Sequence, residues 1–323
     1  MSSRTSWPCA ALANADLADR TTMRVGGRVE WLLEPTTPAE LVAAFQACRE
    51  RGIAPRILGG GANLLIDDGL LAGAVLTTSR LNKLFRAPLE TSAAEALDGD
   101  ENDYSRVAPP ERDRNPRFVA WAGSTLPSVV RAASDLGWSG LEGLAGVPGN
   151  LGGGVAMNAG GRWGDMWDVV ERVRVLDPDG TVRDLARAEC SPRYRDGGLG
   201  ASIVLGAVLA FRVDDPPKVR ERVRDYLLEK RRIQPVTEWS AGCIFKNPPA
   251  EQSNGRSAGR LIDEAGGKGR SRGDAMVSEL HANFIVNRGG ATAADVFTLI
   301  EDMRDLVRQK TGVELETEVK VWR

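Results

Sequence analysis

The sequence has little of what most metal sites and disulfide frameworks need. It contains one histidine and four cysteines among 323 residues, and no two cysteines stand in a C-x-x-C pair. We therefore expect no metal site, and we expect the thiols to be reduced. A basic segment followed by an apolar run is missing from the N-terminus, and no stretch reaches the roughly 20 apolar residues of a membrane span. This pattern predicts a cytoplasmic protein that makes no membrane contact.

An excess of charge of either sign is missing too. The 42 Lys and Arg residues against 44 Asp and Glu residues leave a formal net charge of -2. Binding to a phosphate backbone leaves a basic bias that this balance does not have, so we expect no nucleic-acid partner. The chain does have 42% hydrophobic residues over a length that exceeds one usual compact domain. We expect two or three globular lobes.

Glycine is abundant, with 36 residues, and it gathers in two stretches. The first, Gly59 to Asn63, follows a short apolar strand predicted at 56–58. Before that strand, Thr37-Pro38-Ala39-Glu40 predicts a helix that begins with a capping box. Successive N–H groups at a strand end suit a phosphate or pyrophosphate. A tight turn accounts for three glycines about as often, because the stretch matches neither G-x-G-x-x-G nor a P-loop.

The second glycine-rich stretch runs from 140 to 161. Each glycine costs about 0.5–1 kcal/mol relative to alanine in a helix or strand interior, so we expect no regular element here. A backbone of this kind is suited to approach a bound cofactor closely. The alternative is a disordered linker, which is disfavoured because apolar residues anchor the stretch in a core. These are Leu141, Leu144, Val147, Leu151, Val155 and Met157.

The remaining patterns predict ordinary elements. They are a strand at 118–121, a helix from Leu126, a hairpin around 177–180, a strand from Ile203 to Val213, a helix after Pro216, and a C-terminal helix capped by Thr292 with Asp295. Residues 88–116 are rich in acidic residues, proline and small residues. We interpret this segment as a solvated, flexible insertion.

Eight motifs then occur in an order that resembles the UDP-N-acetylenolpyruvoylglucosamine reductases (MurB family), which are flavoenzymes of bacterial cell-wall precursor synthesis. The motifs are Thr21–Gly27, Gly59–Asn63, Gly140–Gly160, Tyr194–Asp196, Ser240–Pro248, Ala258–Asp263, His281–Asn287 and Leu315–Val319. Together they span the chain from about Thr21 onward. One such motif is weak evidence, whereas eight in order are highly specific. The absence of an inserted substrate loop with a tyrosine between Arg195 and Cys243 suggests the shorter, second subtype.

The resemblance implies an α+β fold with a two-part FAD-binding domain of the vanillyl-alcohol-oxidase (PCMH) type and a C-terminal α+β substrate domain. The boundaries would be 1–80 and 81–215 for the FAD-binding subdomains, and 216–323 for the substrate-binding domain with its catalytic tail. NADPH would reduce FAD, and flavin N5 would pass hydride to the terminal carbon of the enolpyruvyl ether of UDP-N-acetylglucosamine. The product would be UDP-N-acetylmuramate. We expect a monomer that acts on this small molecule.

Site residues carry over from the resemblance position by position. Those implied to bind FAD are Gly59, Gly60, Gly61, Ala62, Asn63, Leu64, Gly143, Pro148, Gly149, Gly152, Gly153, Ala156, Asn158, Ala159, Gly160 and Ile203. Those implied to bind the substrate are Tyr194, Arg232, Lys246 and Asn247. Two positions depart from the pattern, because Ala62 and Gly197 stand where serine is frequent. We expect one or two hydrogen bonds to flavin or substrate to be missing there.

The implied catalytic residues are Arg195, Cys243 and Glu318. Hydride addition to the alkene builds negative charge from C2 into the neighbouring carboxylate, so donors must be fixed there beforehand. A guanidinium offers a planar fork, and a glutamic acid must be protonated to donate, which burial favours. Cys243 would deliver the final proton to C2, since a thiol with an ordinary pKa of about 8.5 is mostly protonated at neutral pH. A free cysteine is otherwise most often a small buried hydrophobe.

Other residues in these motifs have simpler explanations. We favour a packing role for His281, and we expect Asp263 and Glu264 to be surface carboxylates of a helix. Two other classes of protein also remain open. One is a different FAD oxidoreductase on the same scaffold, and the other is a non-catalytic nucleotide-sugar or FAD-binding protein.

Overall fold

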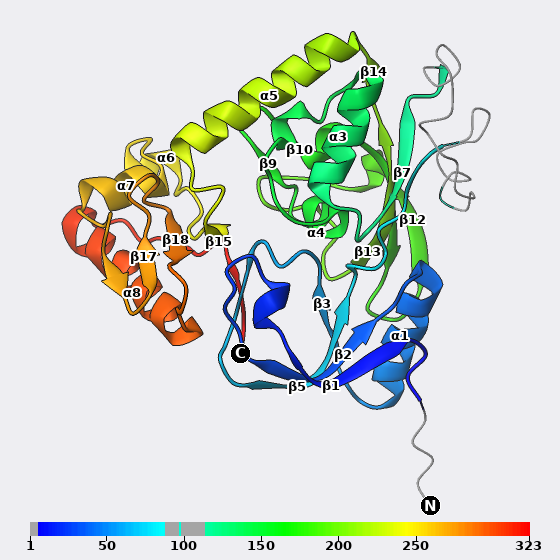
Figure 1. Ribbon diagram of the computed structural model, residues 1–323, viewed down its shortest axis with the longest axis horizontal. Helices are drawn as coiled ribbons and strands as arrows, with labels where there is room; N and C mark the ends of the chain where they lie inside the picture. The colour runs from blue at the N-terminus through cyan, green and yellow to red at the C-terminus, as the bar shows by residue number, and fades with distance from the viewer. Residues whose placement is uncertain (1–5, 88–96, 98–113) are drawn as a thin grey trace, which may run out of the picture. The chain divides into compact units, whose positions relative to one another are not determined.

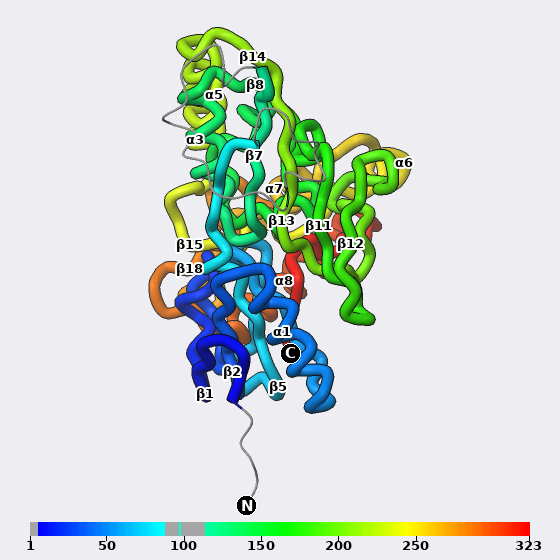
Figure 2. The backbone as a smooth tube through the Cα atoms, turned by 90° about the vertical axis from the view of Figure 1, so that its right-hand side faces the viewer, coloured from blue at the N-terminus to red at the C-terminus, as the bar shows by residue number. Residues whose placement is uncertain are grey.

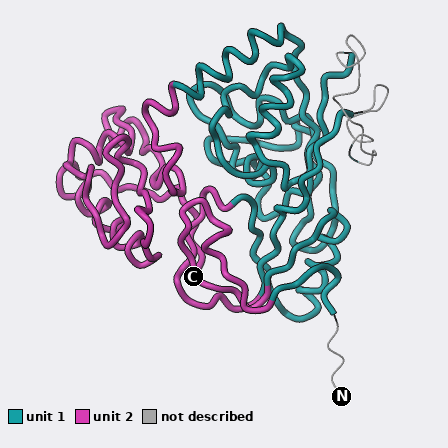
Figure 3. The backbone as a smooth tube through the Cα atoms, in the orientation of Figure 1, with its two compact units in different colours: residues 1–12, 32–60, 74–228 teal, residues 13–31, 61–73, 229–323 magenta. Residues whose placement is uncertain are grey.

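The structure is a computed structural model that describes residues 6–87, 97 and 114–323. The insertion predicted at 88–116 lies almost wholly outside the described residues. The chain forms two compact units (Figure 3): unit 1 comprises residues 1–12, 32–60 and 74–228, and unit 2 comprises 13–31, 61–73 and 229–323. The division at 80 and 215 into functional domains stays a prediction. No helix among the described residues is long and apolar enough to cross a membrane.

The first part of the chain forms a four-stranded sheet. Its order is β1 (Ala10–Asp16), β2 (Arg28–Glu34), β5 (Leu70–Thr77) and β3 (Arg56–Leu58), and the last two are parallel. Helix α1 (Pro38–Glu50) begins at Thr37, whose hydroxyl accepts the Glu40 N–H at 3.1 Å. The Glu40 carboxylate accepts from the N–H and hydroxyl of Thr36 instead. The predicted capping box is therefore half formed, with its second arm displaced by one residue.

Unit 1 contains a five-stranded antiparallel sheet in the order β12-β11-β13-β7-β6, four strands of which can be followed in Figure 2. The strands are β6 (Leu84–Arg86), β7 (Arg117–Trp121), β11 (Val170–Leu176), β12 (Val182–Ala186) and β13 (Ile203–Ala210). The hairpin predicted around 177–180 is confirmed as β11–β12.

The strand predicted from Ile203 to Val213 ends early, at Ala210. The side chain of Phe211 is buried there against Trp138 and Phe118, with ring centroids 5.7 and 5.4 Å away. The next two residues, β14 (Arg212–Val213), then pair with β8 (Trp138–Ser139) in a separate ribbon. Aromatic packing thus turns the chain out of the large sheet.

Two helices pack beside this sheet, and one of them contradicts the prediction of no regular structure in the glycine-rich stretch. Helix α3 (Leu126–Leu136) was expected, but α4 (Leu151–Ala156) is built from Leu-Gly-Gly-Gly-Val-Ala. A Cβ atom on Gly152 would lie 3.0 Å from the Cβ of Ala122, and one on Gly154 would lie 3.1 Å from Leu126. These glycines let the helix pack closer than larger residues allow, which outweighs their low helix propensity.

The rest of the stretch is held in short elements. They are η4 (Glu142–Leu144), β9 (Gly160–Gly161), β10 (Gly164–Asp165) and η5 (Met166–Asp168). Five of the six apolar residues predicted to anchor the stretch do so: Leu141, Leu144, Leu151 and Val155 are buried in the core of unit 1, and Val147 packs against it. Met157 is only partly buried and does not belong to this core.

Unit 2 contains a second sheet, in the order β15-β18-β17-β16. The strands are β15 (Trp239–Cys243), β16 (Ser271–Arg272), β17 (Ala275–Val277) and β18 (Phe284–Asn287), and helices α6 (Ala250–Ser253), α7 (Ala258–Glu264) and α8 (Ala293–Thr311) accompany them. The capping box of α8 is confirmed, with Thr292 and Asp295 bonded reciprocally. Buried side chains of α7, α8 and this sheet share one core. Helix α5 (Pro216–Ile233) precedes the sheet (Figure 1).

A pair of parallel strands in unit 2 joins distant parts of the sequence. Strand β4 (Leu64–Ile66) follows the first glycine loop and runs parallel to β19 (Lys320–Trp322). The carbonyl of Asn63 also accepts the N–H of Lys320 at 3.1 Å. The end of the first glycine loop and the C-terminal tail are therefore fixed to each other.

Candidate active site

The loop between β3 and β4 has the properties of an anion nest. Within the part of the chain that the structure describes, the N–H groups of Gly60, Gly61 and Ala62 donate to no acceptor. A Cβ atom on Gly59 would meet nothing within 4 Å. Successive N–H groups beside open space are the arrangement that binds phosphate oxygens.

The second glycine stretch lies directly against this loop inside unit 1. A Cβ atom on Gly60 would be 2.7 Å from the Cα of Gly149 and 2.9 Å from Oδ1 of Asn150. A Cβ atom on Gly153 would instead point into open space. Two predicted cofactor segments thus meet, and each keeps an open face. The residues present therefore fit a dinucleotide such as FAD.

Other residues predicted to contact FAD also serve the fold. Asn158 is buried, its amide donates to the carbonyl of Arg193 at 3.1 Å, and its Oδ1 accepts the N–H of Trp167 at 3.2 Å. Leu64 is buried in β4, and Ile203 packs on the core cluster of α1. At Gly197, a Cβ atom would lie 2.2 Å from the carbonyl oxygen of Val155, so this backbone has no room for the expected serine.

Arg195 lies in a tight turn of unit 1. The N–H groups of Arg193 and Asp196 each donate to the other's carbonyl, at 2.7 and 3.1 Å. Arg195 has a φ of +58°, in the left-handed region that non-glycine residues rarely adopt. Its Nη1 donates to the carbonyl of Gly160 at 3.1 Å, and its Cζ lies 4.9 Å from the ring centroid of Tyr194. The guanidinium is held from two directions.

A carboxylate also influences this arginine. Asp165 pairs with Gly160 in the β9–β10 ribbon. Burial raises the pKa of Asp165, the neighbouring charge of Asp168 raises it further, and the positive charge of Arg195 opposes both. The turn around Arg195 therefore has the mixed local charge often seen at functional sites.

Cys243 is the last residue of β15 and stands next to an irregularity in the strand. Ser240 faces Val286 while Cys243 faces Phe284, so three steps on β15 match two on β18. Gly242, with a φ of +76°, supplies the conformation that this bulge requires. The bulge re-aims the thiol, which is half-buried.

Glu318 lies on the backbone next to Cys243. Its N–H donates to the carbonyl of Ile244 at 2.7 Å, and its side chain is buried. The amide of Asn63 donates to the carbonyl of Glu318 at 3.2 Å. Unit 2 thus brings together a thiol, a buried carboxyl group and the end of the first glycine loop.

The residues predicted to bind substrate all have protein partners. Lys246 forms an ion pair with Glu316, and Oδ1 of Asn247 accepts the N–H of Ala258 at 3.0 Å. Arg232 pairs with Glu229 at 3.3 Å on the exposed end of α5. Asp263 and Glu264 are ion-paired surface residues, as expected. His281 accepts the N–H of Asn283 and packs edge-on against Phe284, consistent with a packing role.

Two features escaped the sequence analysis. Lys230 is buried, and burial lowers its pKa to about 8; its spacing from Val223 and Tyr226 on the apolar face of α5 was the available signal. Asn283 is also buried, inside a motif from which only His281 was singled out. Its hydrogen bonds span 38 positions in the sequence, which no periodicity reveals.

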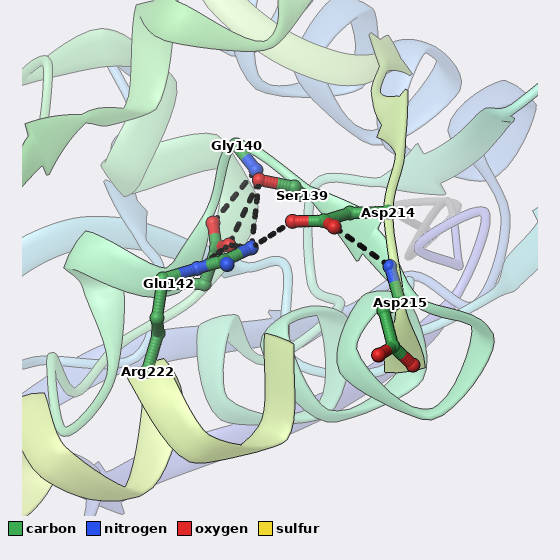
Figure 4. A network of polar contacts seen from close by, with 6 residues as sticks. All are labelled: Ser139, Gly140, Glu142, Asp214, Asp215 and Arg222. Carbon is green, nitrogen blue, oxygen red and sulfur yellow. Dashed lines mark hydrogen bonds and ion pairs between the residues drawn. The ribbon is translucent and has the colours of Figure 1, made fainter. Parts of the chain in front are cut away.

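A cavity of about 780 Å³ in unit 1 contains none of the predicted site residues. Its wall includes the network drawn in Figure 4, where Arg222 donates to Glu142 at 2.8 Å and to Asp214 at 2.7 Å. The carboxylate of Glu142 also accepts from Ser139 and from the N–H of Gly140. This network ties α5 to the start of the second glycine stretch.

The fold and the two glycine segments fit an FAD-binding oxidoreductase. Residues 111–186 match the family described as FAD binding domain, and residues 234–322 match the UDP-N-acetylenolpyruvoylglucosamine reductase C-terminal domain. The curated reductases of this name from Moorella thermoacetica and Deinococcus radiodurans are each 38% identical, covering 96% and 97% of this chain and 93% and 96% of their own lengths.

The crystal structure of UDP-N-acetylenolpyruvylglucosamine reductase (MurB) from Thermus caldophilus superposes with a TM-score of 0.73. It is 34% identical, and the match covers 97% of this chain and 98% of that one. The chain belongs to the UDP-N-acetylenolpyruvoylglucosamine reductase family.

Proposed function

We propose that this chain reduces the enolpyruvyl ether of UDP-N-acetylglucosamine to UDP-N-acetylmuramate, with NADPH as the electron donor, in peptidoglycan precursor synthesis. One observation carries the proposal beyond family membership. Cys243 and Glu318 lie on adjacent backbones, joined through the carbonyl of Ile244, at the end of the loop expected to hold the cofactor. A protein that only binds a nucleotide sugar does not need this pairing.

FAD would be held by the open N–H groups of 60–62 and along the second glycine stretch, and when bound it supplies the hydride. The chain's own residues have three tasks. The Arg195 guanidinium binds the substrate carboxylate as a fork, and protonated Glu318 donates a hydrogen bond to the same developing charge. The Cys243 thiol gives its proton to C2 and is reprotonated from water. One hydride and one proton add across the double bond, and NADPH is oxidised.

Tyr194, Arg232, Lys246 and Asn247 remain our proposed contacts to the substrate. An exposed tyrosine ring and two cations suit a nucleotide diphosphate sugar. Their protein partners would have to exchange when substrate binds. The cytoplasmic location and the monomeric state also stay predictions, and gel filtration tests the second.

An anaerobic experiment with two additions tests this function. Purified protein should be yellow, NADPH should bleach the flavin, and the enolpyruvyl substrate should then restore its absorbance. UDP-N-acetylglucosamine, which lacks the enolpyruvyl group, is the matched control and should leave the flavin reduced. A purified protein without flavin contradicts the proposal and favours a non-catalytic protein that binds a nucleotide sugar. Flavin that is reoxidised by oxygen but not by the enolpyruvyl substrate favours another oxidoreductase on this scaffold.

A further inference from the structure

Asn283 is a buried side chain that completes the strand next to Cys243. Its Oδ1 accepts the N–H of Phe245 at 2.9 Å, and its Nδ2 donates to the carbonyl of Phe245 at 2.8 Å. Its own backbone carbonyl accepts the N–H of Ile244 at 2.8 Å. Only 3% of the residue is exposed. A side-chain amide thus takes the place of a neighbouring strand's peptide group.

The Asn283 amide is needed because the pairing between β15 and β18 ends at Cys243. The last pair of β15 and β18 is Cys243 with Phe284, directly after the bulge, and β18 begins at Phe284. Beyond this pair the chain enters the turn at His281, so the peptide groups of Phe245 face no strand on that side. Buried peptide groups without partners cost about 1–3 kcal/mol each, which the Asn283 amide prevents.

The opposite edge of residues 244–246 pairs with residues 316–318 of the C-terminal tail. Phe245 forms a bridge with Thr317, Ile244 accepts the N–H of Glu318 at 2.7 Å, and the N–H of Lys246 donates to Glu316 at 2.9 Å. Asn283 therefore bonds the first two residues after Cys243 on one side, and residues 316–318 bond or bridge all three residues of 244–246 on the other. A shift of this segment moves Cys243 and Glu318 together.

We propose that Asn283 is a positioning residue for the reaction. It touches neither reacting group itself, and it fixes the backbone that sets where the thiol of Cys243 and the carboxyl of Glu318 stand relative to the substrate. This inference rests on the proposed function. Displacement of a catalytic group by about 1 Å can cost about 10²-fold in rate. Loss of the Asn283 amide can therefore slow the reaction strongly without any direct contact to the substrate.

The chain offers a matched control in the same strand. Asn287 is also buried, its Nδ2 donates to the carbonyl of Met23 at 3.0 Å, and its Oδ1 accepts the N–H groups of Gly289 and Ala291. Asn287→Asp removes a donor from a buried backbone carbonyl, as Asn283→Asp does. The two variants lose similar bonds, but Asn287 bonds neither the segment after Cys243 nor the tail.

The experiment follows the two half-reactions of the FAD-loaded full chain by stopped flow. Asn283→Asp should be bleached by NADPH as fast as the parent and reoxidised by substrate about 10–10²-fold more slowly, with a solvent deuterium isotope effect larger than the parent's. Asn287→Asp should lose comparable thermal stability and keep both rates. In a Cys243→Ala background, Asn283→Asp should slow reoxidation by a smaller factor than it does in the parent, because only the displacement of Glu318 then remains.

Each other outcome counts against the positioning role. Equal half-reaction rates in the two aspartate variants would mean that Asn283 is structural only, and so would loss of flavin from both Asn283→Asp and the milder Asn283→Ser. An undiminished slowing in the Cys243→Ala background would show that Asn283 does not position the thiol. By contrast, a parent protein that substrate fails to reoxidise contradicts the proposed function itself, before any variant is compared.

Discussion

Units 1 and 2 hold their proposed catalytic residues by different means. Arg195 in unit 1 lies in an irregular turn, where its guanidinium contacts the carbonyl of Gly160 and the ring of Tyr194. Cys243 in unit 2 ends a strand paired with β18, and the backbone of Glu318 bonds the carbonyl of Ile244 and the amide of Asn63. An arginine can adjust through its long side chain, whereas a cysteine has one side-chain torsion and moves only with its backbone. Unit 2 therefore needs the more exact backbone.

Removal of the Cys243 thiol should have the largest effect on the rate of the reaction. Cys243→Ala should reduce the rate of substrate reoxidation about 10²–10⁴-fold and leave reduction by NADPH unchanged, because only the second step needs a proton at C2. Stopped-flow absorbance of the flavin measures both steps. Cys243→Ser is the control and should recover much of the loss, since its hydroxyl occupies the same point. An alanine variant that reoxidises at the parent's rate would mean that Cys243 is only packing.

Replacement of Arg195 in unit 1 should have a smaller effect on turnover. Arg195→Lys keeps the charge and the strained φ but loses the bidentate fork, so turnover should fall about 10–10²-fold while substrate still binds. Steady-state kinetics and substrate titration of the oxidised flavin separate the two quantities. Near-normal turnover would place Arg195 away from the reacting carboxylate.

Two neighbouring glycines test the cofactor loop of unit 1. Gly60→Ala places a methyl group 2.7 Å from the Cα of Gly149, so the loops must separate and FAD affinity should fall about tenfold or more. Gly59→Ala has open space around its Cβ in the protein alone. A loss of FAD in Gly59→Ala therefore reports contact with the cofactor itself. Flavin absorbance after gel filtration measures retention, and full retention in both variants would refute the loop assignment.

The smallest effect concerns the network of Figure 4. Burial by itself raises the pKa of Glu142, but hydrogen bonds from the N–H of Gly140, from Arg222 and from Ser139 outweigh it, so the pKa is lowered overall. A lowered native pKa stabilises the fold fully above the unfolded value of about 4.3, and this contribution is lost as pH falls through the native value.

Arg222→Ala should therefore lower stability at pH 7 by about 1–2 kcal/mol, a range reduced because the arginine is one-third exposed. The variant should also lose stability less steeply than the parent between about pH 5 and 3. Thermal unfolding across this range measures both effects. Arg224→Ala, which removes exposed ion pairs of the same helix, is the control. Identical pH profiles for parent and Arg222→Ala would exclude the linkage.

Elements with local signals could be predicted from the sequence. The reciprocal bonds of Thr292 and Asp295 start α8 as expected, because caps depend on residues three apart. Helix α4 could not be predicted, because its glycines are explained by Ala122 and Leu126, which approach only in the folded chain. The same reason applies to the end of β13, where burial of Phe211 decides the path.

The candidate site, like the fold, has features that the sequence predicted and features that it did not. The ordered motifs located Arg195, Cys243 and Glu318, because family resemblance is carried by residue type and position. They did not reveal that Asn283 bonds both peptide groups of Phe245, which is a property of three-dimensional pairing. Nor did they explain the departure at Gly197, where the nearby carbonyl of Val155 excludes a side chain.

The parallel pairing of β4 with β19 has a consequence for protein synthesis. On the ribosome, Leu64–Ile66 emerges early, but its partner Lys320–Trp322 is translated last among the described strands. During elongation this apolar strand therefore lacks that partner, and the Glu318 N–H and Ile244 carbonyl cannot bond until residue 318 has left the exit tunnel. The nascent chain can complete unit 1 first, whereas unit 2 closes only after translation of residue 322.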